Sequence, residues 1–155
     1  MTLYAIRQPA WAESLEDVEV VDESKYGWEF LKQAITLWRL VDSARADQIE
    51  VIKDRVVRAA GDKEVRLGAE ELRELVRLFS GIEDAIVAAG IVDSEWHVPP
   101  ERLEELAKQV PAMDLKTERS LHNKTSALGE VISNAIFLRN FLSNAISGGC
   151  TVVRA

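Results

Sequence analysis

The sequence predicts a mainly α-helical protein, a single-domain bundle over residues 1–155 in which about five helices surround a central C-terminal helix. A small β ribbon formed by the N- and C-terminal strands completes the expected fold. Two observations support this prediction: apolar residues recur every three or four positions over most of the chain, and both ends carry short β-branched segments. The length of 155 residues suits one domain.

The N-terminal segment is predicted to be extended. Residues 2–7 contain β-branched and aromatic side chains that alternate between two faces, which indicates a strand, and Pro9 ends it. Residues 13–23 are acidic, and their valines fit either a second extended piece or a short helical turn. The sequence leaves both alternatives open.

Helical periodicity begins near Tyr26, where the apolar residues change to three- and four-residue spacing. Ser24 stands where a helix N-cap is expected, because its hydroxyl can accept a backbone N–H of the first turn. The polar residues 42–48 predict a break before a second helix. Gly61 is expected to end that helix as its C-cap.

A third helical pattern follows the short segment 65–67. Apolar residues between positions 72 and 87 share one face, which predicts a helix of about 20 residues with a kink at Ser80 and Gly81. Gly90 is expected to end it.

The C-terminal third contains the longest helical pattern. Residues 96–100 are expected to be extended because each proline disfavours helix in the residue before it, and a short helix is expected from Pro100 to Pro111. The long helix is predicted from about Asp114 to Ser147.

Residues 131–146 of the long helix are apolar on nearly all sides, which places them at the centre of the bundle. Two glycines then end the helix, and residues 150–153 are typical of a strand. Isolated strands leave backbone groups unpaired, so we expect this strand to pair with residues 3–7.

Composition and motifs exclude several classes of function. The formal net charge of −7 disfavours binding to nucleic acid, and the longest apolar run, eight residues, is too short to cross a membrane. The single cysteine fits a reducing compartment, so a cytoplasmic location is expected. Nucleotide-binding, zincin, calcium-loop and serine-hydrolase motifs are absent, which predicts no cofactor and no enzymatic activity.

Residues that could carry metal or thiol chemistry are few. His122 lies four residues after Glu118 and could share a metal with Glu130, but this spacing is more typical of a solvated surface pair. Cys150 beside two glycines is more typical of buried packing than of a nucleophile. We therefore predict no metal site and no catalytic residue.

The acidic residues are concentrated in two blocks, each with seven acids and one base, over residues 13–29 and 83–105. Such blocks are either solvated faces or docking surfaces for a basic partner, and a tryptophan in a proline-containing segment lies just before the first block, at Trp11, and within the second, at Trp96. The first predicted partner-binding group is Trp96, Asp93, Glu95, Glu101, Glu104 and Glu105. The secondary group is Trp11, Glu16, Asp17, Glu19, Asp22 and Glu23.

These features favour a non-catalytic, acidic protein-binding module. The most concrete instance is an immunity-type inhibitor that sequesters a basic protein such as a toxin, an analogy of properties rather than of motifs. One alternative is a small-ligand-binding or regulatory protein with a pocket around Trp38, Asn134 and Asn140. A second alternative is an enzyme that uses unrecognised carboxylates.

Overall fold

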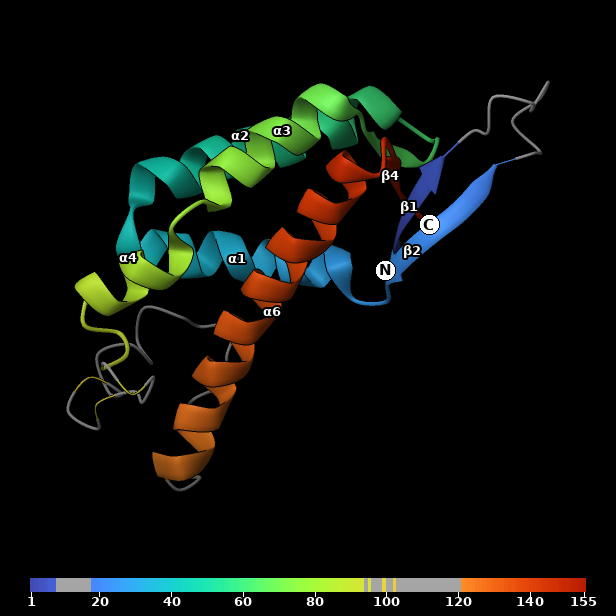
Figure 1. The fold of residues 1–155 in the computed structure, drawn as a ribbon. Helices are drawn as coiled ribbons and strands as arrows, with labels where there is room; N and C mark the ends of the chain where they lie inside the picture. The colour runs from blue at the N-terminus through green and yellow to red at the C-terminus, as the bar shows by residue number, and fades with distance from the viewer. Residues whose placement is uncertain (8–17, 94, 96–98, 100–101, 103–120) are drawn as a thin grey trace.

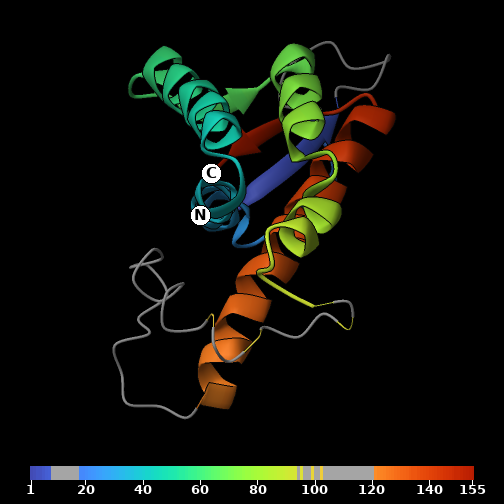
Figure 2. The ribbon, with the colours of Figure 1, turned by 90° about the vertical axis from the view of Figure 1, so that its left-hand side faces the viewer.

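A computed structural model describes residues 1–7, 18–93, 95, 99, 102 and 121–155, with side chains from residue 129 onward in the last range. Figure 1 shows the helices grouped beside a small sheet, and Figure 2 shows the same arrangement at a right angle, with α6 running diagonally across the molecule. The fold is mostly helical, as predicted. None of the helices in the described ranges combines the length and hydropathy needed to cross a bilayer.

The predicted pairing of the two chain ends is confirmed. Strand β1 (Leu3–Arg7) pairs antiparallel with β4 (Thr151–Arg154), so that Tyr4 lies opposite Val153. The sheet is larger than the predicted ribbon, because β2 (Glu19–Ser24) and β3 (Val65–Leu67) pair antiparallel with its two free edges. The strand order is β2-β1-β4-β3.

In the acidic segment 13–23, whose conformation the sequence left open, residues 19–23 belong to the strand β2, and residues 13–17 lie outside the described residues. The pairing of β2 with β1 shifts by one residue between Ala5 and Ile6, which is a β-bulge on the β2 side. The expected N-cap role of Ser24 is wrong, because Ser24 is the last residue of β2 and the next helix begins three residues later.

The first two helices follow the sequence pattern with a shorter break than expected. Helix α1 (Gly27–Val41) and helix α2 (Ser43–Ala60) are separated by Asp42 alone, which has an extended backbone. The Asp42 carboxylate accepts the backbone N–H of Arg45 at 3.3 Å, so α2 starts with a side-chain cap directly after the break. Gly61 ends α2 with φ 56°, as predicted.

The expected kinked helix consists of two helices, α3 (Ala69–Phe79) and α4 (Ile82–Ala88). Ser80 has an extended backbone, and Gly81 has φ 75°, a left-handed conformation that glycine adopts without a Cβ penalty. These two residues therefore interrupt the helix instead of bending it.

Helix α6 (Leu121–Ser147) ends at Gly148 and Gly149, as predicted. The expected start near Asp114 and the expected short helix between Pro100 and Pro111 lie outside the described residues. The central position of α6 is not confirmed, because one side of the helix is exposed, with Phe137 at 63%. The other exposed residues on this side are Glu130, Ser133, Asn140, Asn144 and Ser147. The helix count of the whole bundle stays a prediction.

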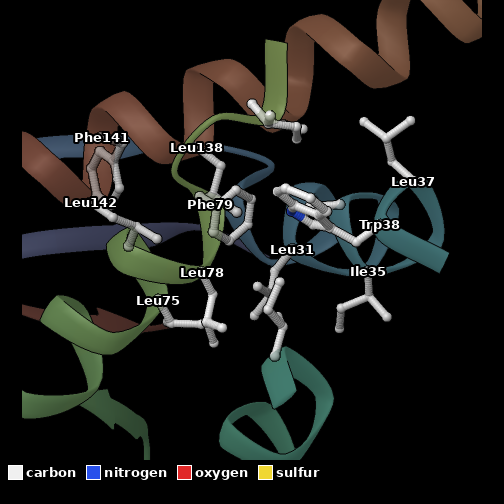
Figure 3. Packing of buried hydrophobic residues seen from close by; sticks show 14 of the residues in the cluster. Leu31, Ile35, Leu37, Trp38, Leu75, Leu78, Phe79, Leu138, Phe141 and Leu142 are labelled. Carbon is white, nitrogen blue, oxygen red and sulfur yellow. The ribbon is translucent and has the colours of Figure 1, made fainter. Parts of the chain in front are cut away.

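The hydrophobic core lies between the helices and one face of the sheet. Leu3, Ala5 and Val152 point into it from the two middle strands. Figure 3 shows Trp38 of α1 and Phe79 of α3 packed among leucines of α1, α3 and α6. Because side chains alternate along a strand, burial of these strand residues turns their neighbours to the opposite face of the sheet.

A half-buried ion pair joins α4 to α6. The Arg139 guanidinium donates to the Glu83 carboxylate at 2.6 Å. Burial alone would raise the pKa of Glu83, but the hydrogen bond from Arg139, a backbone N–H and the charge of Arg139 outweigh it and hold this pKa below its ordinary value of 4.5. The pair therefore stabilises the docking of α4 on α6 at neutral pH.

The middle of the sheet is predicted to be sensitive to loss of core volume. Val152→Ala removes two methyl groups from a side chain that is 0% exposed, so the free energy of unfolding should fall by about 2 kcal/mol. The matched control is Val57→Ala on the exposed side of α2, which should be neutral or slightly stabilising because alanine favours helix. Urea unfolding measures both. Equal losses would contradict the placement of Val152 in the core.

The ion pair between Glu83 and Arg139 predicts a pH-dependent contribution. The pKa of Glu83 is lower in the folded than in the unfolded protein, so its contribution is complete above the ordinary pKa and is lost as the pH falls through the folded-state pKa. Glu83→Gln should cost on the order of 1 kcal/mol at neutral pH and much less in acid. Urea unfolding across this pH range, with the exposed Glu130→Gln as control, checks it. A cost independent of pH would contradict the assignment.

Candidate functional site

The first predicted binding group is described in part. Asp93 and Glu95 are both exposed, and the Asp93 carboxylate accepts the backbone N–H of Glu95 at 2.9 Å. Trp96, Glu101, Glu104 and Glu105 lie outside the described residues. Whether this group forms one surface therefore stays a prediction.

The secondary binding group is placed more fully. Glu19, Asp22 and Glu23 all lie on β2 and are exposed, whereas Trp11, Glu16 and Asp17 lie outside the described residues. Within the described part of the chain, β2 pairs with β1 on one side and with no strand on the other. The three acids thus belong to an open edge of the sheet.

The charges of β2 are largely exposed, with one neighbouring counter-charge on β1. Arg7 donates to the Glu19 carboxylate at 3.1 Å, and both side chains are about half exposed. The Asp22 carboxylate accepts the backbone N–H of Glu23 at 2.9 Å. An exposed pair of this kind stabilises little in water, so these acids are available to a further cation.

An apolar hollow of about 380 Å³ lies next to this edge, on the face of the sheet opposite the core. Tyr4 and Ile6 line it because Leu3 and Ala5 point into the core. Val153 belongs to the same face by the same alternation. The complete lining is Tyr4, Ile6, Val18, Val20, Glu64, Arg66 and Val153.

A second hollow, of about 690 Å³, adjoins the first at the C-terminal end of α2. The two hollows share Glu64 and Arg66, whose side chains form an ion pair of 3.1 Å. The rest of the second lining is Val56, Ala59, Ala60 and Lys63. The hollow on the outer face of the sheet therefore borders the end of α2, with the ion pair of Glu64 and Arg66 between the two hollows.

The sequence did not predict this hollow. The alternation of residues 2–7 does place Tyr4 and Ile6 on one face. Their apolar neighbours come from β2 and β4, however, and the pairing of β2 was left open.

The three residues of the predicted ligand pocket, Trp38, Asn134 and Asn140, do not line one common hollow. Trp38 lines a hollow of about 420 Å³ with Asp42, Arg45 and Ser80. Asn134 of α6 donates to the Gln33 side chain of α1 at 3.0 Å. Asn140 accepts from its neighbour Arg139. The two asparagines are thus engaged within the fold, and neither is among the described residues that line this hollow.

Arg45 of the Trp38 hollow is engaged within the fold, whereas the buried Nε1–H of Trp38 has no hydrogen-bond partner among the described residues. The Arg45 guanidinium lies 4.8 Å from the centre of the Trp38 ring and donates to the backbone carbonyl of Ser80 at 2.7 Å. It therefore joins the start of α2 to the α3–α4 connection.

The residues considered for metal or thiol chemistry form no such site in the part of the chain that the structure describes. Within the ranges that the structure describes, no group of three or more His, Cys, Asp and Glu residues is placed to hold a metal ion. The side chains of His97, His122 and Glu118 lie outside those ranges. Cys150 is buried, with Sγ 3.7 Å from the carbonyl oxygen of Gly148.

Comparison of the chain with protein-family models, with curated proteins and with solved structures gives no match. The candidate site therefore rests on its own geometry: three acids on a strand edge, beside an apolar hollow.

The role of Arg45 in the fold gives a test of the Trp38 hollow. Arg45→Met keeps the length of the side chain but removes the cation above Trp38 and the bond to Ser80, so the free energy of unfolding should fall by about 1 to 2 kcal/mol. Arg58→Met, in the last turn of the same helix, is the matched control and should change it little. Chemical denaturation measures both. If Arg45→Met leaves the stability unchanged, Arg45 is free to serve a ligand.

Proposed function

We propose that the protein is a non-catalytic protein-binding module that docks a basic partner on the β2 edge and the adjoining outer face of the sheet. An immunity-type inhibitor that sequesters a basic protein such as a toxin is the most concrete form of this function. A cytoplasmic location belongs to the same proposal, on the ground that the chain contains one cysteine.

One observation supports the proposal most strongly: an apolar hollow lies beside β2, a strand that carries three exposed acids, of which Glu23 shares the face of the hollow. Val20 connects the acidic strand to the hollow, because it lies in β2 and its side chain lines the hollow. Protein interfaces commonly combine an apolar centre with a charged margin. A solvated acidic face that only keeps a protein in solution needs no such hollow.

The two parts of the surface contribute to different steps of binding. Glu19, Asp22 and Glu23 attract a cationic partner over a distance, which raises the association rate and falls with added salt. The hollow lined by Tyr4, Ile6 and Val20 holds an apolar side chain after contact, which lowers the dissociation rate.

The proposal is tested on a basic partner isolated from the native host and purified. Glu19→Lys with Glu23→Lys should slow its association about tenfold at low salt, and less at high salt, in surface plasmon resonance. The matched control, Asp54→Lys with Glu70→Lys on α2 and α3, makes the same change in net charge and should leave the rate nearly unchanged.

Two outcomes would contradict this placement. Equal slowing by the test and control pairs would show that net charge alone matters. Wild-type rates for the test pair, combined with slower association of Glu101→Lys with Glu104→Lys and faster dissociation of Trp96→Ala, would assign binding to the first predicted group instead.

A further inference from the structure

Within the described residues, the edge of β2 away from β1 exposes backbone groups as well as acidic side chains. Ala155 donates its backbone N–H to the Thr2 carbonyl at 3.1 Å, so the backbone groups of Thr2 face β4. In an antiparallel sheet successive residues direct these groups to opposite sides. The backbone groups of Leu3, Ala5 and Arg7 therefore face β2.

The pairing of β1 with β2 then shows which residues of β2 direct their N–H and C=O groups toward β1. The partners of Leu3, Ala5 and Arg7 are Ser24, Asp22 and Glu19, so these three direct their backbone groups to β1.

Val20 and Glu23 consequently direct their N–H and C=O groups away from the sheet. A separate contact agrees with this assignment, because the Glu23 N–H bonds to the Asp22 side chain and not to β1.

An exposed edge of this kind can accept another strand, either from a copy of the same chain or from a different protein. A second copy would bring Glu19, Asp22 and Glu23 against the same three acids, and like charges facing each other across strands are destabilising. A basic segment would meet these acids with opposite charge. Charge complementarity thus favours a foreign basic strand.

We propose that an extended, lysine- or arginine-rich segment of the partner adds to the sheet as a fifth strand beside β2. This rests on the proposed function and specifies its mode of binding. The segment would bond to the outward backbone groups of Val20 and Glu23.

Side chains of the added strand would follow the same alternation as the rest of the sheet. An apolar residue beside Val20 faces the hollow that Tyr4 and Ile6 line. A basic residue beside Glu23 meets its carboxylate. In the free protein the Asp22 carboxylate accepts the backbone N–H of Glu23. A backbone carbonyl of the incoming strand would accept this N–H instead, and Asp22 could then pair with a cation.

The probe for this proposal is a blocked ten-residue peptide that alternates valine and lysine along one face, with threonine at the positions between, added to the full chain labelled with ¹⁵N. We expect its binding to shift the amide resonances of Val20 and Glu23 and to slow their hydrogen exchange. The decisive comparison is the same peptide with an N-methyl group on every residue. It keeps the charge and side chains but loses the backbone donors on both edges, so it should bind at least about tenfold more weakly.

A variant of the chain gives an independent test. Val20→Pro removes an outward N–H without removing a bond to β1, and it should weaken peptide binding about tenfold or more, whereas Val20→Thr should bind within about threefold of the wild type. Circular dichroism of both variants verifies that the fold is intact.

Strand addition is overturned if the alternating peptide does not bind, if its resonance shifts map away from β2, or if the N-methylated peptide binds equally well. Dimerisation of the free chain with protected β2 amides, seen by sedimentation, would assign the edge to a second copy instead. If both peptides bind equally and Glu19→Lys with Glu23→Lys weakens both, the acidic face still docks basic proteins and strand addition alone is wrong.

Discussion

The pairing of β1 with β4 is the constraint on which the rest of the structure depends. It joins residues 3–6 to residues 151–154, so almost the whole chain is one loop closed by this ladder. Closing a loop of that length costs conformational entropy, which the buried side chains of the two strands offset. Once the ladder exists, β2 and β3 have edges to pair with, and the helices between them have a common surface to pack against.

The same ladder divides the sheet into two faces with different roles. Leu3, Ala5 and Val152 face the helices, so Tyr4, Ile6 and Val153 must face the other way. Tyr4, Ile6 and Val153 are aromatic or β-branched residues, which are frequent in strands. Because strand pairing turns them to the outer face, that face is apolar around them. A concave apolar surface next to an open edge is the feature that a binding partner would use.

The acids of β2 can both oppose pairing with another copy of the chain and favour a basic partner. Open strand edges risk pairing with other copies of the same chain, and acids of one sign along the edge oppose this. The same acids favour a partner of opposite charge. By contrast, Asn134, which the sequence offered for a ligand pocket, and Arg45, which lies over Trp38, are bonded across helix contacts and contribute to the packing of the fold.

Local patterns in the sequence determined the helical class and the ends of α2 and α6 at glycines, because apolar periodicity and glycine conformation act over short stretches. They also determined the pairing of the chain ends, because two isolated strands have few other partners for their backbone groups. They also identified Glu19, Asp22 and Glu23 as candidates through charge. Only the tertiary structure decided that residues 19–24 form a strand at the edge of the described sheet, that Ser80 and Gly81 separate two helices, and that Tyr4, Val20 and Val153 meet around one hollow. Each of these outcomes depends on contacts between residues far apart in the chain, and a local pattern carries no information about which distant strand or helix completes them.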